Sequence, residues 1–245
     1  MGRLNSYIFT LVILPVLLNF SIKAQEWSYS GENGPANWAS IAAEYQNCSN
    51  GERQSPINIV PNLNGNLQPL VIRYQDNGAE VSNNGNSVHI SFEPRSELAI
   101  GINRYQLSQV NLHTPSEHQI TGQGYGMEAQ LIHTDSEGKI LILAILYEVG
   151  NENKQLNNAL SVLPQASQAN TLISALNSET FLPENLDYFR YVGSLTTPPC
   201  LESLTWIILK TPAEISQEQV DSLRNVITNE NNRPVQPING RVVVE

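Results

Sequence analysis

Hydrophobic and polar residues alternate over short segments along most of the chain from about residue 71. Such segments occupy residues 70–74, 79–83, 87–92 and 97–100, and Asn-Gly or Pro-containing turns separate them. Successive side chains of a strand point to opposite faces, so this alternation predicts half-buried β-strands. Residues 103–113, "NRYQLSQVNLH", alternate most clearly if one slip near Ser108 is allowed.

Longer hydrophobic stretches complete the predicted fold. Residues 125–134 alternate again, residues 139–150 are almost continuously apolar, as in a strand covered on both faces, and residues 202–210 return to strand. Helical spacing occurs at residues 153–163, 167–176 and 216–227, the last with Ser216 as a candidate N-cap. Residues 25–70 are rich in Gly, Asn, Pro and Ser and predict irregular chain. We predict a mixed α+β, mainly β, single domain over residues 25–245, built on a large, mostly antiparallel twisted sheet with peripheral helices.

The first 24 residues have the order of a secretory signal peptide. A basic start with Arg3 precedes an apolar stretch, and a small residue, Ala24, follows it. The apolar stretch is short for a membrane span, which needs about 20 residues, and Pro15 interrupts it. A retained anchor is the alternative. We expect a secreted or extracellular chain, or a periplasmic one in a bacterium, with no membrane anchor after signal removal.

The charge balance argues against nucleic acid as a partner. The 245-residue chain has a formal charge of −10, and removal of residues 1–24 takes away Arg3 and Lys23 but no acid, which leaves −12. Phosphate contacts need clustered Lys and Arg, and the sequence has no such cluster.

Two cysteines, Cys48 and Cys200, suit one disulfide in an exported protein, with two free thiols as the alternative. Asn47 begins a formal N-glycosylation sequon, Asn47-Cys48-Ser49, whose use the sequence does not decide.

Three polar side chains are expected to converge on one face of the sheet. Asn111 and His113 are two residues apart in one predicted strand, so they share a face. Gln130 lies in the next long strand and reaches the same place if the two strands are neighbours.

Five motifs give the chain a resemblance to the α-class carbonic anhydrases over nearly its whole predicted mature length. "GENGPANW", "GERQSPINI", "HTPSEH", "GSLTTPPC" and "NNRPVQP" occur in the order and at about the spacing of the family. The resemblance implies zinc held by three histidines, and it places them at Asn111, His113 and Gln130, of which only His113 matches. At the proton-shuttle position the chain has Asn86.

Other family positions are retained. The resemblance assigns the gatekeeping hydroxyl to Thr196 and its orienting acid to Glu117. It also pairs Cys48 with Cys200 and makes His118 and His133 buried structural histidines. The family's carbon dioxide pocket corresponds to Ile132, Ile142, Leu195, Thr197 and Trp206.

The replaced ligands set the functional expectation. Imidazole suits zinc, whereas neutral amide oxygen is a weak ligand, so the degenerate site at Asn111, His113 and Gln130 is expected to hold no zinc. In its place, we expect His113 to hydrogen-bond to Asn111 or Gln130, and Glu117 to Thr196. Replacement at these two positions resembles the acatalytic carbonic-anhydrase-related proteins, and some plant storage and defence proteins of the family also carry Gln at the third.

The sequence therefore predicts a secreted pseudoenzyme that binds an unknown protein or small ligand, or serves a structural or storage role. One alternative is an active, zinc-dependent carbonate dehydratase with an atypical metal site. Another is a weak esterase activity in the retained cleft.

Overall fold

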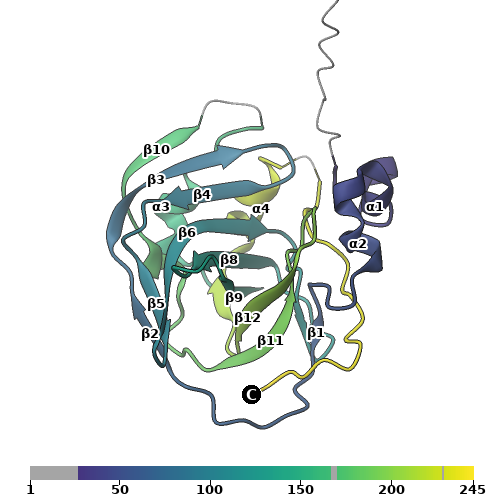
Figure 1. Cartoon of the computed structure of the whole chain (residues 1–245). Helices are drawn as coiled ribbons and strands as arrows, with labels where there is room; N and C mark the ends of the chain where they lie inside the picture. The colour runs from purple at the N-terminus through teal and green to yellow at the C-terminus, as the bar shows by residue number, and fades with distance from the viewer. Residues whose placement is uncertain (1–26, 167–169, 228) are drawn as a thin grey trace, which may run out of the picture.

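The computed structural model describes residues 27–166, 170–227 and 229–245. Eleven strands of these residues form one curved sheet (Figure 1). The strand order is β10-β3-β4-β6-β8-β9-β12-β11. In addition, β5 pairs with β6, β2 pairs with β5, and β13 pairs with β9. The bounds are β2 Leu70–Arg73, β3 Asp76–Asn83, β4 Val88–Phe92, β5 Glu97–Ile100, β6 Asn103–His113, β8 Met127–Thr134, β9 Ile140–Val149, β10 Thr171–Asn177, β11 Tyr188–Ser194, β12 Glu202–Leu209 and β13 Ala213–Ile215. A separate two-stranded sheet pairs β1 (Asn58–Ile59) with β7 (Gln119–Ile120).

The predicted fold class, mainly β with a large sheet and few helices, is confirmed. Neighbouring strands of the large sheet run antiparallel except where β9 pairs in parallel with β12 and with β13, and β1 pairs with β7 in parallel in the small sheet. Residues 97–100 and 103–113 form β5 and β6 over their full predicted lengths. The slip expected near Ser108 is a register shift between Leu107 and Gln109 in the pairing of β6 with β8.

The helices are fewer and shorter than the sequence predicts. Residues 153–163 give only η3 (Lys154–Leu156) and α3 (Asn157–Leu160), while 216–227 give α4 (Gln217–Arg224). Ser216 caps α4 as predicted, in a capping box with Gln219. The predicted helix over residues 167–176 is wrong, since its described part, from Thr171 onward, belongs to strand β10. Pairing with the edge of β3 outweighs the helical spacing there.

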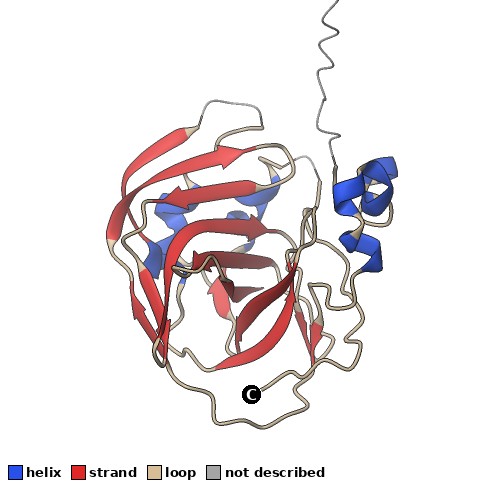
Figure 2. Cartoon of the chain, in the orientation of Figure 1, coloured by secondary structure: helices blue, strands red, loops and turns tan. Residues whose placement is uncertain are grey.

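Each face of the sheet carries its own hydrophobic core. On β9, Leu141, Leu143, Ile145 and Tyr147 pack into the larger core, which also contains residues of α3 and α4. The residues between them, Ile142, Ala144 and Leu146, pack into a second core with Trp206 on the opposite face. Helices α3 and α4 lie behind the sheet in Figure 2, so Ile142 lies on the face opposite these two helices. Strand β9 is buried on both faces, as its continuous apolar sequence predicts.

The amino-terminal part of the described chain packs as short helices against one side of the sheet. These are η1 (Gly31–Asn33), α1 (Trp38–Ile41), η2 (Ala43–Tyr45) and α2 (Asn47–Asn50). Their apolar residues form a small core that includes Trp38 and the disulfide. Of the stretch expected to be irregular, residues 31–50 thus contain single turns of helix, whereas residues 51–69 are irregular apart from β1.

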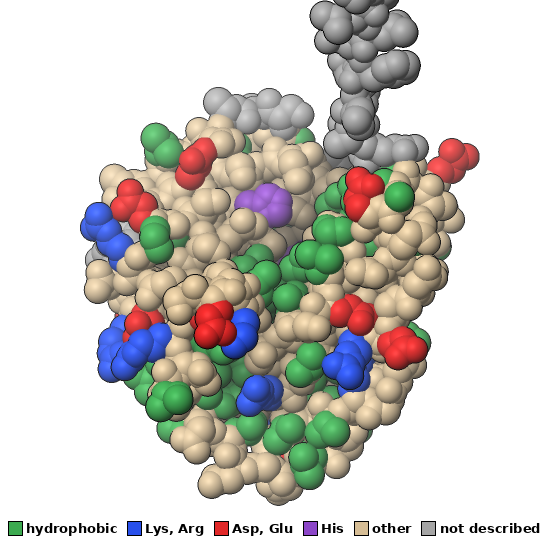
Figure 3. All heavy atoms as spheres, in the orientation of Figure 1, with side chains coloured by type: hydrophobic (Ala, Val, Ile, Leu, Met, Phe, Trp, Pro, Cys, Tyr) green, Lys and Arg blue, Asp and Glu red, His purple; other side chains and the backbone are tan. Residues whose placement is uncertain are grey.

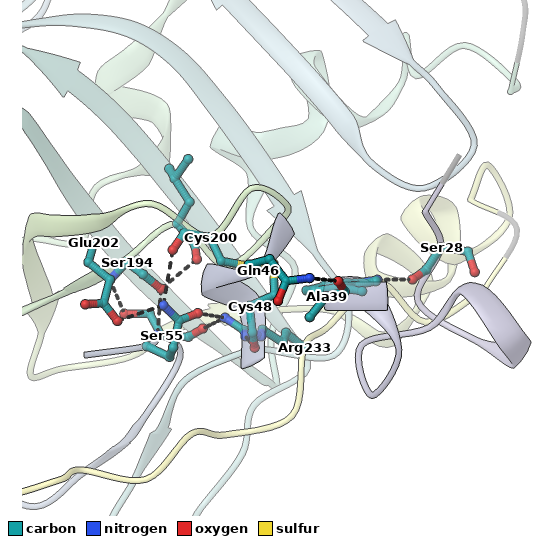
Figure 4. Close-up of a disulfide and its surroundings, with 12 residues drawn as sticks. Ser28, Ala39, Gln46, Cys48, Ser55, Ser194, Cys200, Glu202 and Arg233 are labelled. Carbon is teal, nitrogen blue, oxygen red and sulfur yellow. Dashed lines mark hydrogen bonds between the residues drawn. A yellow bond between two sulfur atoms is a disulfide. The ribbon is translucent and has the colours of Figure 1, made fainter. Parts of the chain in front are cut away.

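A disulfide joins this part to the loop after β11. Cys48 and Cys200 are bonded at 2.08 Å across 152 residues of sequence (Figure 4). The guanidinium of Arg233 donates a hydrogen bond of 2.8 Å to the carbonyl of Cys48, and its plane faces the Trp38 ring. The Cys200 N–H donates to the carbonyl of Thr197 at 2.9 Å. The disulfide therefore anchors the segment that contains Thr196 and Thr197.

The predicted signal peptide, residues 1–24, lies outside the described residues. Among the helices of the part that the structure describes, none has the length and apolar character needed to cross a bilayer.

Candidate functional site

Three polar residues form a row across neighbouring strands on the face of the sheet opposite α3 and α4. His89 on β4 pairs with Asn111 on β6, and Asn111 pairs with Gln130 on β8. His113 lies two residues beyond Asn111, so it shares this face. The structure thus brings Asn111, His113 and Gln130 together as the sequence predicts, and it adds His89, which the sequence analysis missed. Pairing between residues 87–92 and 103–113 was the signal that could have found it.

Gln130 is bound by two buried carboxylates. Its amide nitrogen donates to Glu117 Oε2 at 2.7 Å and to Glu128 Oε1 at 3.0 Å. Ionised carboxylates only accept hydrogen bonds, so both amide hydrogens are used and the amide cannot turn without losing them. Gln130 is 2% exposed, and both acids are equally buried. The sequence analysis did not single out Glu128.

Glu128 is held in its ionised form by its neighbours. Its carboxylate accepts from the backbone N–H groups of Glu117 and His118, at 2.9 and 2.8 Å, and from His118 Nδ1 at 2.8 Å. Burial alone would raise the pKa of Glu128, but the imidazole of His118 outweighs it and lowers that pKa to about 2. The contacts between Glu128 and His118 fix the loop that carries Glu117 beneath Gln130.

Glu117 does not have the partner that the sequence analysis expects. Among the hydrogen bonds of the described residues, none joins Glu117 to Thr196. Glu117 instead accepts from Gln130 and, at 2.9 Å, from the backbone N–H of Arg233. An amide at position 130 can donate two hydrogen bonds, whereas an imidazole nitrogen donates one. Gln130 therefore occupies the carboxylate of Glu117, which was expected to bond to Thr196.

His113 also differs from the expectation, because it hydrogen-bonds to neither Asn111 nor Gln130. Its Nδ1 donates to the carbonyl of Asn231 at 2.7 Å. Its Nε2 is buried and has no hydrogen-bond partner in the described chain, although the side chain is only 1% exposed. An imidazole ring with its proton on Nδ1 carries a lone pair on Nε2. His113 therefore has one free hydrogen-bond acceptor, Nε2.

Asn111 has His89 and Gln109 as its hydrogen-bond partners. Its Oδ1 accepts from His89 Nδ1 at 2.7 Å and from the amide of Gln109 in a short contact. Gln109 Nε2 also lies 2.9 Å from His89 Nδ1. Burial lowers the pKa of His89, so its imidazole is neutral at neutral pH. At the shuttle position, the Asn86 amide donates to the Trp27 carbonyl at 2.7 Å and offers no titratable proton.

The apolar residues that the sequence analysis assigns to a pocket belong to or pack against the second core. Ile142 and Trp206 are buried in the second core, Ile132 and Leu195 pack against it, and Trp206 Nε1 donates to the Ser194 carbonyl at 2.9 Å. Figure 3 shows a histidine in a shallow hollow of one face, beside a group of hydrophobic side chains. Of the four histidines in the sequence, His89 is the one that is not buried. Thr196 is buried, and Thr197 is partly exposed.

The residues at the three ligand positions do not fit a zinc ion held by three imidazoles. Gln130 directs its amide nitrogen to two carboxylates, and Asn111 Oδ1 accepts two hydrogen bonds, so only His113 Nε2 is a free nitrogen donor. No group of three or more His, Cys, Asp or Glu side chains in the described chain could hold a metal ion. Zinc prefers imidazole and thiolate to neutral amides, which makes this donor set a poor zinc site.

A sequence model of the eukaryotic-type carbonic anhydrases matches residues 33–245. The chain belongs to the α-carbonic anhydrase family. A carbonic anhydrase of Neisseria gonorrhoeae is 38% identical over 241 residues, which cover 96% of each chain.

Solved structures agree with this family assignment. An α-carbonic anhydrase from Thermovibrio ammonificans, in complex with sulfanilamide, has a TM-score of 0.87 and 39% identity, and the match covers 90% of this chain and 99% of that one. Dioscorin complexed with ascorbate has a TM-score of 0.83 and 29% identity, with 89% of this chain and 97% of that one covered.

Two further histidines are structural in this member of the family, as the resemblance implies. His118 contacts Glu128 through Nδ1 and the Tyr191 hydroxyl, at 2.7 Å, through Nε2. His133 donates from Nδ1 to the Leu131 carbonyl at 2.8 Å and accepts from the Tyr74 hydroxyl at 2.6 Å. Both are fully buried, so neither has a ring nitrogen available to a ligand.

Proposed function

We propose that the chain is an exported member of the carbonic anhydrase family that does not hydrate carbon dioxide and acts by binding a partner or small ligand. The observation that carries this proposal is the pair of hydrogen bonds from Gln130 Nε2 to Glu117 and Glu128. They satisfy both buried acids without a metal.

The chemistry of carbon dioxide hydration explains why these contacts matter. A catalytic zinc needs three protein ligands and an open position for water, and the metal lowers the pKa of that water to about 7. Without the metal, this site has no group that could form hydroxide at neutral pH. Glu117 is bonded to Gln130 and to the Arg233 backbone, so it does not orient Thr196 either.

A binding role uses what the site retains. His113 Nε2 is a buried acceptor without a partner in the described chain, and Ile132, Leu195 and Trp206 belong to or pack against the second core. The similarity to dioscorin, whose structure was solved in complex with ascorbate, supports a small polar molecule as one class of ligand. A protein partner is the other class.

An active carbonic anhydrase with an atypical metal site is the second candidate function. His89 favours it, because this imidazole lies directly beside Asn111 and could supply a nitrogen that the three family positions lack. Relatives of the chain named carbonic anhydrase also support this candidate.

Metal content and carbon dioxide hydration separate the two candidates. The chain without residues 1–24 is purified, its zinc is measured by elemental analysis, and hydration is followed by stopped flow with and without added Zn²⁺. We expect substoichiometric zinc and hydration at the uncatalysed rate. One zinc per chain with fast, sulfonamide-sensitive hydration would overturn the proposal. A carbonic anhydrase that retains three zinc-binding histidines serves as the positive control.

A further inference from the structure

In the described chain, four strands of the large sheet pair with another strand on one side only: β2, β10, β11 and β13. An unpaired edge exposes backbone groups that can pair with another chain, and natural proteins protect such edges with charges, proline, short strands or a covering segment. Three of the four edges have such protection. Strand β2 follows Pro69 and contains Arg73, β13 has only three residues, and Val244 covers part of β11 through two backbone hydrogen bonds of 2.9 Å with Arg190.

Strand β10, at the outer end of the sheet in Figure 1, has neither charge nor proline. Its residues, Thr171–Asn177, include no Lys, Arg, Asp, Glu or Pro. Its register with β3 is regular from Thr171 to Ile173 and shifts only after that residue. Leu172, in the middle of this regular part, is 78% exposed, more than any other large apolar side chain in the described strands. Strand β10 is therefore the edge of the large sheet that is best suited to accept another strand.

A surface groove with a volume of about 610 Å³ borders Leu172. The sheet register forms it from one row of residues, since Leu172 is directly opposite Glu80 on β3, and Glu80 is directly opposite Ser91 on β4. Gly78 lies two positions from Glu80 on the same face and adds no side chain. A side chain of a strand added to β10 would therefore pass over Leu172 into the groove.

The groove is acidic. Glu80 and Glu93 line it, and none of its lining residues is Lys or Arg. The Glu80 carboxylate accepts a hydrogen bond from the Asn170 amide and takes part in no ion pair with another described residue. Glu93 pairs with Arg95 at 3.2 Å, but both side chains are exposed, and such pairs contribute little. The chain has a formal charge of −10, so a second copy would bring more negative charge to this surface, whereas a basic segment would be attracted.

We propose that β10 binds an extended basic segment of a partner protein as an added strand. Main-chain hydrogen bonds give affinity in this mode of recognition, and alternate side chains give specificity. On the groove face, the stem of a lysine or arginine packs on Leu172, and its charge reaches Glu80. An added strand lies about 10 Å from β3, two strand spacings away, which a long basic side chain and a glutamate bridge together. Apolar residues alternate with the basic ones and lie on the opposite face, beside Ile173. This surface is separate from the cleft, so the inference stands whether or not zinc binds.

Peptide titration tests the surface. The probe is a blocked octapeptide of alternating lysine and valine, and the comparison is the same peptide with glutamate in place of lysine. Fluorescence anisotropy of the labelled peptides measures binding to the chain without residues 1–24. The lysine peptide should bind at least about tenfold more tightly than the glutamate peptide, because like charges across an interface are strongly unfavourable. Its affinity should fall as salt is added, since exposed charges are screened.

Three variants locate the binding. Leu172→Lys should weaken binding of the lysine peptide at least about tenfold, because it places a like charge on the edge and removes the apolar contact. Val71→Lys on β2 is the matched control, since Val71 is also an exposed apolar residue of an edge strand and the change in charge is the same. It should leave the affinity unchanged. Glu80→Gln should weaken binding by up to about fivefold, the effect of an exposed ion pair, and reduce its dependence on salt.

The outcomes separate the possible occupants of the edge. Equal affinity for the two peptides, or equal losses in Leu172→Lys and Val71→Lys, would overturn the proposal. Sedimentation velocity of the chain alone tests for a second copy. A concentration-dependent dimer that Leu172→Lys dissociates would assign β10 to self-association and overturn the basic partner. Zinc plays no part in these measurements, so failure of the proposed function would appear separately, in the metal analysis and the hydration assay.

Discussion

Gln130 Nε2 lies 2.7 Å from Glu117 Oε2, and this contact replaces the one expected between Glu117 and Thr196. A second bond from the same nitrogen reaches Glu128 at 3.0 Å. Two buried carboxylates require positive charge or donated hydrogens, and a neutral amide supplies the hydrogens. Glutamine at position 130 thus supplies hydrogen bonds to both acids, while His113 Nε2 has no partner in the described chain.

Gln130→Met should destabilise the fold substantially, because methionine keeps the approximate volume but donates no hydrogen bond. Hydrogen bonds to charged groups contribute about 1.5–3 kcal/mol each, so losing two should lower the free energy of unfolding by about 3–6 kcal/mol. Urea denaturation at pH 7 measures the change. Gln109→Met on the neighbouring strand, where the amide is half-buried and contacts no acid, is the control and should cost much less. Equal losses in the two variants would contradict the structural role of Gln130.

Asn111→His combined with Gln130→His should create zinc binding. Three imidazoles would then share the face of the sheet on which Asn111, His113 and Gln130 now lie, and histidine at 130 would release Glu117 toward Thr196. Elemental analysis should find about one zinc per chain in the double variant, and carbon dioxide hydration should rise above the uncatalysed rate. Each single variant is a control with weaker binding. A double variant that folds but holds no zinc would show that the cleft has changed beyond its ligands.

The sequence predicted the position of the site well because β-strand alternation is simple. Once residues 103–113 form a strand, Asn111 and His113 must share a face, and the slip near Ser108 was visible in the same alternation. The convergence of Gln130 with Asn111 was predicted only on the condition that the two strands are neighbours, and the pairing of β6 with β8 meets that condition. The predicted helix at 167–176 failed because spacing alone does not show that a sheet edge is available for pairing.

The hydrogen bonds of the site could not be predicted in the same way. His113 bonds to the carbonyl of Asn231, which is distant in sequence and lies in irregular chain. The position of Glu117 beneath Gln130 depends on the loop after Thr114, whose backbone N–H groups at Glu117 and His118 donate to Glu128. Such contacts depend on tertiary geometry, so residue types alone identified the acids and amides but not their partners.

Loss of the disulfide should weaken the fold without rearranging the site. Cys48→Ser combined with Cys200→Ser removes a link across 152 residues. Removing a native disulfide typically costs about 2–5 kcal/mol. Arg233 still joins Cys48 and Ser55 through their backbone carbonyls, at 2.8 Å each, so the amino-terminal helices should stay docked. Thermal and urea denaturation measure the loss, and an unchanged near-ultraviolet circular dichroism spectrum is the control. A double variant as stable as the parent would contradict the prediction.

Acidification below pH 6.5 should destabilise the fold through His133. Burial lowers the pKa of this imidazole from 6.5 to about 4. The unfolded state therefore binds more protons between these values, and stability falls as the pH decreases through the window. Between pH 7 and pH 5, the loss from this residue is about 2 kcal/mol. Urea denaturation at the two pH values measures it.

Two variants separate His133 from the other acid-sensitive groups. His133→Gln should remove most of the difference between pH 7 and pH 5. His89→Gln should remove less, because the pKa of this half-buried imidazole is lowered by a smaller amount. Glu128 loses its contribution only below about pH 4.5, since its pKa is lowered to about 2, so it does not contribute between pH 7 and pH 5. If the His133→Gln variant keeps the full pH dependence, then the buried, neutral imidazole is not its source.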